Sequence, residues 1–280
     1  MKLLRYGPAG QEKPGMLAAD GILRDLSSIV TDIAGEAISP AGLDRLRAVD
    51  VQSLPPVEGN PRLGPCVAGL QKIVCIGLNY SDHAAETGAE PPEEPIIFAK
   101  ALNALCGPDD DVEMPRGSKA LDWEVELAVI IGTKAKYVNE ADAMNHVAGF
   151  AIMNDVSERD FQTKRSGQWT KGKSHDTFGP LGPWLVTRDE VGDPHDLDMW
   201  LDVNGERRQT GNTNTLIFNV PHVISYLSRF MTLMPGDVVS TGTPPGVGMG
   251  MKPPQYLKAG DVMTLSIAGL GEQRQTIVNA

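Results

Sequence analysis

Cysteine and basic side chains are scarce in this sequence of 280 residues, and long apolar runs are missing. Cys66, Cys75 and Cys106 are odd in number and form no C-x-x-C pair, which excludes a disulfide framework and predicts free thiols in a cytoplasmic protein. Because 36 acidic residues oppose 25 lysines and arginines, the formal charge of −11 argues against nucleic acid or an anionic membrane as partner. No apolar run reaches the roughly 18 residues of a membrane span, and the opening residues lack the apolar segment of a secretory signal.

The chain does have enough apolar residues for a sizeable core, and one proline-rich break. Apolar residues make up 41% of the chain. Residues 54–65 read LPPVEGNPRLGP, and this concentration of proline and glycine is typical of a linker. We therefore predict a small N-terminal α+β domain over residues 1–65 and a larger catalytic domain over residues 66–280.

Local patterns favour many strands and few helices. Apolar alternation or short apolar runs predict strands at 72–79, 96–100, 122–132 and 149–155. Asp20-Gly21 and Asn204-Gly205 each predict a two-residue hairpin turn. Helices are expected at 39–49, 81–87 and 220–231, with weak helical character at 141–146. Because helices and strands do not alternate regularly, the pattern indicates an α+β fold with a mixed, curved sheet.

Glu124 and Glu126 lie two positions apart in the predicted strand over residues 122–132. Side chains at this spacing point to the same face of a strand, while the intervening apolar residues face the core. Carboxylates this close repel each other unless a cation lies between them. A solvated sheet face is the alternative interpretation, but Ala128 and Ile130 continue the same face and indicate that it becomes buried.

Asp155 ends the predicted strand over residues 149–155, at the kind of position where strands commonly present site residues. Together with the two glutamates it forms an all-oxygen donor set without a nearby cysteine. Such a set favours a hard cation, so Mg²⁺ or Mn²⁺ is expected rather than Zn²⁺.

His83 and Glu86 lie three positions apart on the predicted short helix. This spacing places both on one helix face within hydrogen-bonding reach, where the carboxylate would orient the imidazole as a general base. An ordinary exposed His–Glu pair is the alternative. The proline-rich acidic loop that follows, near residues 86–95, favours the functional interpretation because lids that close over sites have this character.

Other motifs match known sites in letters but not in physical context. Residues 167–174, GQWTKGKS, match the phosphate-loop pattern, but neither a buried strand before them nor a helix after them is expected. The adjacent residues 174–176, SHD, cannot converge as a hydrolase triad. The acidic residues 109–111 are expected in a solvated turn. The glycine-rich residues 242–250 are a candidate carboxylate cradle, because no helix follows to make a dinucleotide site.

Taken in chain order, several of these stretches resemble the fumarylacetoacetate hydrolase family. The resemblance runs from about Lys72 to the C-terminus and is carried by GLNYSDHAAE, DWEVELAVIIG, MNDVSERDFQ, KGKSHDTFGPLGP, VNGERRQTG and TGTPPGVG. It implies the mixed β-roll of that family with a small N-terminal domain, and a homodimer as the usual assembly.

The resemblance also implies roles for individual residues. The metal ligands of the family, which bind Mg²⁺, Mn²⁺ or Ca²⁺, fall on Glu124, Glu126 and Asp155. The residues that contact substrate fall on Arg159, Gln162, Thr243 and Lys100, although Ala101 here replaces the proline that commonly follows the last of these. The histidine and glutamate of the lid and the catalytic lysine fall on His83, Glu86 and Lys173.

Within the family, residues 1–15 and 249–275 resemble members that hydrolyse 2,4-diketo-3-deoxy sugar acids of the fuconate and rhamnonate type, often labelled ureidoglycolate lyase. This implies C–C hydrolysis of a small 2-oxo acid to pyruvate and a second acid, with water activated by His83. Ureidoglycolate lyases, isomerases and decarboxylases share the motifs, so those reactions stay open. A non-enzymatic carboxylate-binding module would predict an incomplete catalytic set, whereas each of the metal-binding, substrate-contacting and catalytic positions named above is occupied.

Overall fold

The computed structural model describes residues 1–88 and 90–280, and all of their side chains except those of Ala85 and Thr87. Ala89, which falls in the expected lid loop, lies outside the described residues. None of the described helices combines the length and the apolar character that crossing a bilayer requires.

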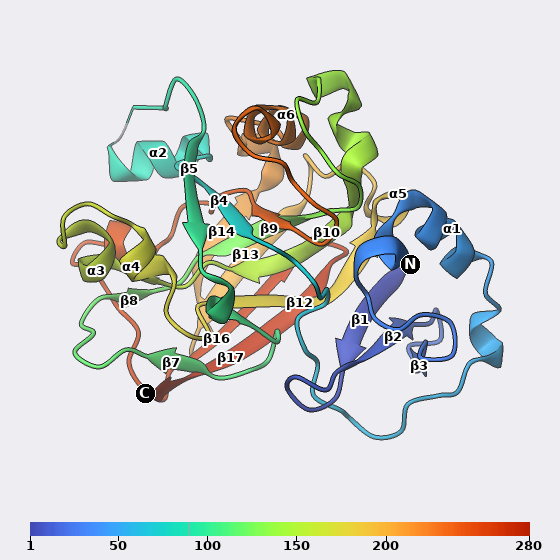
Figure 1. The fold of residues 1–280 in the computed structure, drawn as a ribbon. Helices are drawn as coiled ribbons and strands as arrows, with labels where there is room; N and C mark the ends of the chain where they lie inside the picture. Colours follow the sequence, from blue (N-terminus) through green and yellow to red (C-terminus); the bar gives the residue numbers. More distant parts are fainter. Residues whose placement is uncertain (89) are drawn as a thin grey trace.

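A large ten-stranded sheet forms the centre of the molecule (Figure 1). Its strands run in the order β3-β2-β1-β12-β10-β9-β15-β4-β5, and β6 pairs with β12 off this path. The bounds of these strands are β1 Lys2–Tyr6, β2 Lys13–Leu17, β3 Leu23–Asp25, β4 Ile73–Gly77, β5 Ile96–Lys100, β6 Leu105–Cys106, β9 Val125–Ile131, β10 Val147–Asn154, β12 Gly179–Thr187 and β15 Val238–Ser240.

Two smaller sheets complete the β structure. A five-stranded sheet runs β14-β13-β16-β17-β7, and β8 pairs with β11. Most neighbouring strands are antiparallel, but β15–β4, β12–β6 and β17–β7 are parallel, so the expected mixed character is confirmed. The bounds are β7 Val112–Met114, β8 Leu121–Asp122, β11 Ser157–Glu158, β13 Asp198–Val203, β14 Glu206–Asn212, β16 Val262–Ile267 and β17 Gly271–Asn279.

Helices are short and lie at the edges of the sheets. Figure 1 shows α2, α3 and α4 on one side of the molecule, away from α1 and the N-terminal strands. The α-helices are α1 Pro40–Arg47, α2 Ser81–Thr87, α3 Arg159–Thr163, α4 Thr170–Lys173, α5 Arg188–Val191 and α6 Val220–Phe230. Short 3-10 turns occur at Gly35–Ile38, Val51–Ser53, Leu102–Ala104, Glu140–His146, Thr213–Thr215 and Gly248–Gly250.

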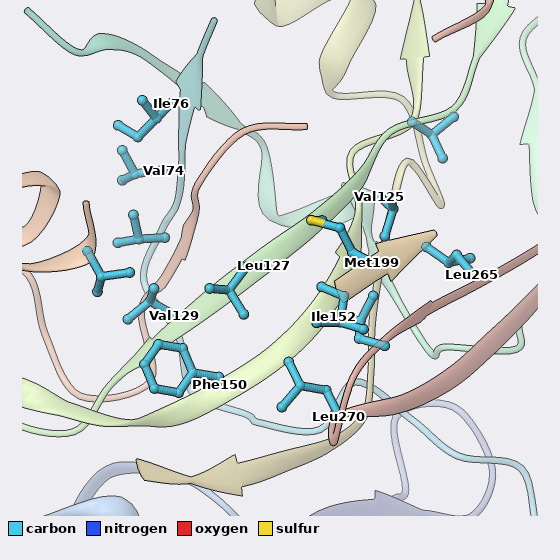
Figure 2. Packing of buried hydrophobic residues seen from close by; sticks show 14 of the residues in the cluster. Val74, Ile76, Val125, Leu127, Val129, Phe150, Ile152, Met199, Leu265 and Leu270 are labelled. Atoms are coloured by element: carbon cyan, nitrogen blue, oxygen red, sulfur yellow. The ribbon is translucent and has the colours of Figure 1, made fainter. Parts of the chain in front are cut away.

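The strand β9 is buried on both faces. Val125, Leu127 and Val129 belong to one apolar cluster, in which residues of the five-stranded sheet such as Met199 and Leu265 also lie (Figure 2). Ala128 and Ile130 belong to a second cluster, which includes residues of α1 and the N-terminal strands. Each fully buried aliphatic side chain contributes about 1.5–3 kcal/mol, so β9, which contains Glu126 and begins directly after Glu124, is firmly held.

The N-terminal residues 1–65 continue the large sheet rather than standing apart from it. Strand β1 pairs with β12, with Lys2 opposite Val186 and Leu3 opposite Leu185. The division into two domains at residues 54–65 stays a prediction. Across this linker, Arg62 Nη2 lies 2.5 Å from Asp110 Oδ2, so the acidic turn at 109–111 serves to fasten the linker.

The predicted local elements are largely confirmed. Asn204 and Gly205 form the two-residue turn between β13 and β14, both with positive φ as the favoured hairpin turn requires. The Asp20-Gly21 prediction is wrong in length: Leu17 pairs with Leu23, and the Ala18 N–H donates to the Ile22 carbonyl, so the loop is longer than two residues. The Asp20 carboxylate accepts from the Ile22 N–H and stabilises this wider turn.

Candidate active site

Three buried carboxylates meet where β9 begins and β10 ends. Oxygen atoms of Glu124, Glu126 and Asp155 all lie within 4.8 Å of one another. Antiparallel pairing of β9 with β10 sets Met153 opposite Glu126, and the Asp155 N–H donates to the Glu124 carbonyl at 2.9 Å. Adjacent strand ends therefore bring the three side chains together.

Buried cations surround two of these carboxylates. Lys173 Nζ lies 2.7 Å from Glu124 Oε2 and 2.6 Å from Asp155 Oδ2. Arg159 Nη2 lies 2.6 Å from Glu124 Oε1, and Lys100 donates to Asp155. Burial opposes ionisation of Glu124, but the charges of Arg159 and Lys173 outweigh it and hold the pKa of this carboxyl well below its usual range.

Glu126 has a different environment. It accepts hydrogen bonds from Ser240 Oγ at 2.6 Å and from the Gly242 N–H at 2.9 Å, and among the described residues no cation forms an ion pair with it. Burial, followed by the charges of Asp155 and Glu124, raises the pKa of Glu126. A divalent cation among these oxygen atoms would relieve that repulsion, so the donor set fits a hard metal ion.

Asp122 joins the arginine to a distant loop. Its carboxylate accepts from Arg159 Nε at 2.8 Å, and also from the Gly248 and Met249 N–H groups at 2.7 and 3.0 Å. Gln162 accepts from the same guanidinium at 3.1 Å. We did not predict Asp122 from the sequence, although it extends the spacing of Glu124 and Glu126 by one further step along the same face.

His83 and Glu86 form the expected pair on α2. His83 Nδ1 lies 3.1 Å from Glu86 Oε2, and the histidine side chain is only 9% exposed. The Gly246 N–H donates to both oxygens of the Glu86 carboxylate, at 3.0 and 3.2 Å. The loop over residues 242–250 therefore fixes the carboxylate that holds the histidine.

The glycine-rich loop is a carboxylate cradle, but its N–H groups bind carboxylates of the chain itself. Gly242 donates to Glu126, Gly246 to Glu86, and Gly248 to Asp122. Gly246 has a φ of +104°, and a Cβ atom there would meet the Arg208 carbonyl oxygen at 2.0 Å. Only glycine can present its N–H to Glu86 from this position.

Most of the predicted site residues line one cavity of about 230 Å³. Thr243 is fixed there, since its hydroxyl donates to the Val125 carbonyl at 3.0 Å and accepts from Gln209 at 2.8 Å. Lys100 and Asp155 do not line the cavity but are buried beside residues that do. Glu86 does not line it either, but it contacts the lining residue His83. The lining includes His83, Glu124, Glu126, Arg159, Gln162, Lys173 and Thr243, and also Ile76, Gly77, Leu78, Phe98, Thr163, Trp169, Gly242 and Met249.

The rejected motifs have structural roles. Helix α4 lies inside the phosphate-loop match, and a helix, α3, precedes it instead of a strand. Ser174 Oγ accepts from the Ala101 N–H, and Asp176 accepts from Asn103 Nδ2 at 2.5 Å, so these residues fasten the segment after β5. Trp169, inside the same match, lines the cavity and was not predicted as a site residue.

Comparison with known proteins places this site in a family. The family described as fumarylacetoacetate (FAA) hydrolase C-terminal matches residues 72–278, which include every residue that lines the cavity. The chain belongs to the fumarylacetoacetate hydrolase family. The expected α+β fold of that family is confirmed, and membership makes the chain an enzyme.

Similar proteins span the same length. A Burkholderia ambifaria protein, named provisionally as a hydrolase, is 60% identical, and the match covers all of both chains. The structure of a fumarylacetoacetate hydrolase from Exiguobacterium antarcticum has a TM-score of 0.89 and 36% identity over all of both chains. A maleylpyruvate hydrolase from Sphingobium sp. SYK-6, in complex with manganese(II) and pyruvate, has a TM-score of 0.83 and 29% identity over all of both chains.

A further neighbour shows that related chains differ in chemistry. It is named provisionally as a 2-hydroxyhepta-2,4-diene-1,7-dioate isomerase from Mycobacterium abscessus, with a TM-score of 0.85 and 32% identity over 100% of this chain and 99% of that one. Together with the buried acidic triad, the manganese-bound neighbour supports a divalent metal at Glu124, Glu126 and Asp155. Membership of the family therefore leaves the reaction open, and the residues around the triad determine it.

Proposed function

We propose that this enzyme is a divalent-metal-dependent hydrolase that cleaves the C3–C4 bond of a 2,4-diketo acid to give pyruvate and a second carboxylic acid. One observation carries the proposal: a carboxylate-held histidine lines the same cavity as two carboxylates of the acidic triad and a buried lysine. A metal site alone would serve several reactions, whereas hydrolysis also needs a base that can activate water.

Glu124, Glu126 and Asp155 would hold the ion, which we propose to be Mg²⁺, with Mn²⁺ or Ca²⁺ as substitutes. Bound there, the ion would supply Lewis-acid stabilisation of negative charge on the α-keto acid end of the substrate. Arg159, Gln162 and Thr243 would orient that end through its carboxylate. Lys100 would act on the substrate indirectly, by holding Asp155.

In the proposed reaction, His83 accepts a proton from water through Nε2, because Nδ1 faces Glu86. The resulting hydroxide attacks the C4 carbonyl, and the C3–C4 bond then breaks with its electron pair moving into the pyruvate enolate. Lys173 stabilises the enolate charge, and C3 takes up a proton to complete pyruvate. One water is consumed, so the products are pyruvate and the acid derived from the C4 acyl group.

The finer assignment concerns the acyl group. Resemblance to the members that act on 2,4-diketo-3-deoxy sugar acids implies a hydroxylated group, and thus a place in sugar acid breakdown. We propose further that the enzyme is cytoplasmic and acts as a homodimer. Its partner is a small 2-oxo acid.

Isomerisation of a 2-oxo acid is the second candidate, favoured by the neighbour named as an isomerase. Isomerisation moves a proton without consuming water, so His83 would then shuttle a proton on substrate carbon. Decarboxylation and ureidoglycolate cleavage would use the same triad. The products distinguish all of these reactions.

The test follows the ultraviolet absorbance of acetylpyruvate with protein stripped by EDTA and with the same protein refilled with Mg²⁺. We expect absorbance loss only after refilling, with pyruvate and acetate formed in equal amounts. Absorbance loss without pyruvate would indicate tautomerisation. No loss in either sample would remove C–C hydrolysis of acylpyruvates from consideration.

A further inference from the structure

The cavity lining combines charged and polar side chains, two of them from the triad, with a set of apolar side chains that we call the apolar wall. These are Ile76, Leu78, Phe98, Trp169 and Met249. With the keto acid end of a 2,4-diketo acid at the triad, these apolar side chains are the part of the lining that would contact its acyl group.

Phe98 and Trp169 form the aromatic part of that wall. Their ring centroids lie 5.2 Å apart with an interplanar angle of 60°. The Phe98 ring centroid lies 4.9 Å from Lys173 Nζ, so the wall begins beside the triad and continues to the indole. Edge-to-face pairs of this kind hold both rings in place.

Gly77 makes room for the indole. At the end of β4, a Cβ atom on this residue would lie 2.7 Å from Trp169 Cζ3 and 3.0 Å from Cη2. The backbone of β4 therefore packs directly against the ring. This close approach sets the position of Trp169, which stands in the segment that matches a phosphate loop in letters only.

Hydroxyl groups in the lining already have partners. Thr163 donates to the Arg159 carbonyl at 2.8 Å, and Thr243 donates to the Val125 carbonyl at 3.0 Å. A hydroxyl on the acyl group would leave water for a wall that is aliphatic and aromatic carbon apart from the indole N–H of Trp169. Burying a hydroxyl without a hydrogen-bond partner is unfavourable.

We infer that the enzyme selects 2,4-diketo acids with an apolar acyl group, and that Trp169 is the residue that sets this preference. The inference rests on the proposed function. It assigns an alkyl acyl group to the substrate, in place of the hydroxylated acyl group of a sugar acid. The cavity size limits the group to a short one, since about 150 Å³ is enough to hold benzene.

The test compares 2,4-dioxohexanoate with 5-hydroxy-2,4-dioxohexanoate, two substrates that differ by one hydroxyl group. We expect kcat/KM to favour the first by at least about tenfold, a discrimination of the size that apolar pockets achieve. Trp169→Ala should reduce the preference to within about threefold, and Trp169→Leu should retain most of it. Trp200→Ala is the matched control, because Trp200 packs on Arg207 away from the cavity and should leave the ratio unchanged.

Gly77→Ala tests the placement of the indole. The new methyl group should displace the ring and lower the preference by a similar factor. In a Trp169→Ala background the same change should have no further effect, because the clash has gone. Fully additive effects of Gly77→Ala and Trp169→Ala on the preference would overturn the inference. Equal or faster turnover of the hydroxylated substrate, or an unchanged ratio of the two kcat/KM values in Trp169→Ala, would also overturn it.

A binding measurement separates failure of the inference from failure of the proposed function. Calorimetry on Mn²⁺-loaded protein should show 2-oxopentanoate binding about tenfold more tightly than pyruvate, and Trp169→Ala should remove most of this difference. If neither diketo acid is cleaved but the binding preference holds, hydrolysis is wrong and the apolar selection stands. If both are cleaved without preference and the two 2-oxo acids bind equally, the selection is wrong and hydrolysis stands.

Discussion

Glu126 lies in β9, and Glu124 and Asp155 directly flank β9 and β10, two paired strands that are buried along their length. By contrast, His83 and Glu86 are carried by α2, a helix of seven residues at the edge of the molecule. Buried apolar side chains on both faces of β9 hold the first group, whereas a backbone N–H of the loop over residues 242–250, that of Gly246, holds the second through Glu86. The metal half of the site is thus built into the core. The histidine half depends on a few directed hydrogen bonds.

The largest effect should come from breaking the metal half. Glu126→Gln removes one of three anionic ligands while keeping the size of the side chain, so the affinity for Mn²⁺ should fall by at least about 100-fold and metal-dependent turnover should be lost. Titration of Mn²⁺ into stripped protein measures this. Glu206→Gln, at an exposed position on β14, is the control; unchanged Mn²⁺ affinity in Glu126→Gln would contradict the metal assignment.

Breaking the histidine half should leave the metal half intact. His83→Ala should reduce kcat by about 10²–10⁴, as loss of a general base does, with the Mn²⁺ affinity unchanged. His222 is a matched control because its Nδ1 also faces a glutamate, Glu140, at 3.2 Å but at an exposed site. Full turnover in His83→Ala would exclude its role in activating water.

Asp122→Asn tests whether the two halves are coupled. This carboxylate joins Arg159, and through it Glu124, to the loop that fixes Glu86. We expect both the Mn²⁺ affinity and kcat to fall by about 10–100-fold, since residues that orient ligands have effects of this size. A change in kcat with unaltered Mn²⁺ affinity would show that the halves act independently.

Gly246→Ala should disturb the histidine half alone. The methyl group would meet the Arg208 carbonyl oxygen, and the displaced N–H would no longer hold Glu86. We expect kcat to fall by about tenfold, as for the loss of one hydrogen bond to a charged group. Mn²⁺ titration serves as the internal control, because an equal loss of metal affinity would indicate general damage to the loop.

The smallest effect is expected at the outer end of the lid segment. Tyr226 Oη donates to Glu94 Oε2 at 2.7 Å on an exposed surface. Tyr226→Phe removes this bond, and steady-state kinetics should show a change in kcat of no more than about threefold, since exposed hydrogen bonds contribute little. A larger loss would mean that the segment near residues 86–95 is positioned from α6.

The metal half was predictable from the sequence because its signals are local. Strand periodicity places Glu124 and Glu126 on one face, and a strand end presents Asp155. The same periodicity extends to Asp122, but the partners of that residue come from a helix and a loop far along the chain. Nothing in local sequence indicates that Gly248 will donate to it.

The histidine half and the apolar wall were harder to predict from the sequence, because their contacts come from distant parts of the chain. Helix spacing predicts that His83 and Glu86 meet, yet the N–H group that fixes the carboxylate comes from Gly246, 160 residues away. Trp169 and Gly77 meet only because α4 packs against β5, the neighbour of β4. The periodicity of side chains along a helix or strand determines on which face a residue lies. The packing of that element against others determines which residues it contacts.

The pairing of β1 with β12 has a further consequence for the catalytic part of the chain. A fragment without residues 1–65 would leave the backbone near Leu185 and Val186 as an open strand edge, and would uncover the apolar side of β9 around Ala128 and Ile130. Open edges beside exposed apolar surface recruit strands from other molecules. The N-terminal strands thus protect the sheet from edge-to-edge aggregation.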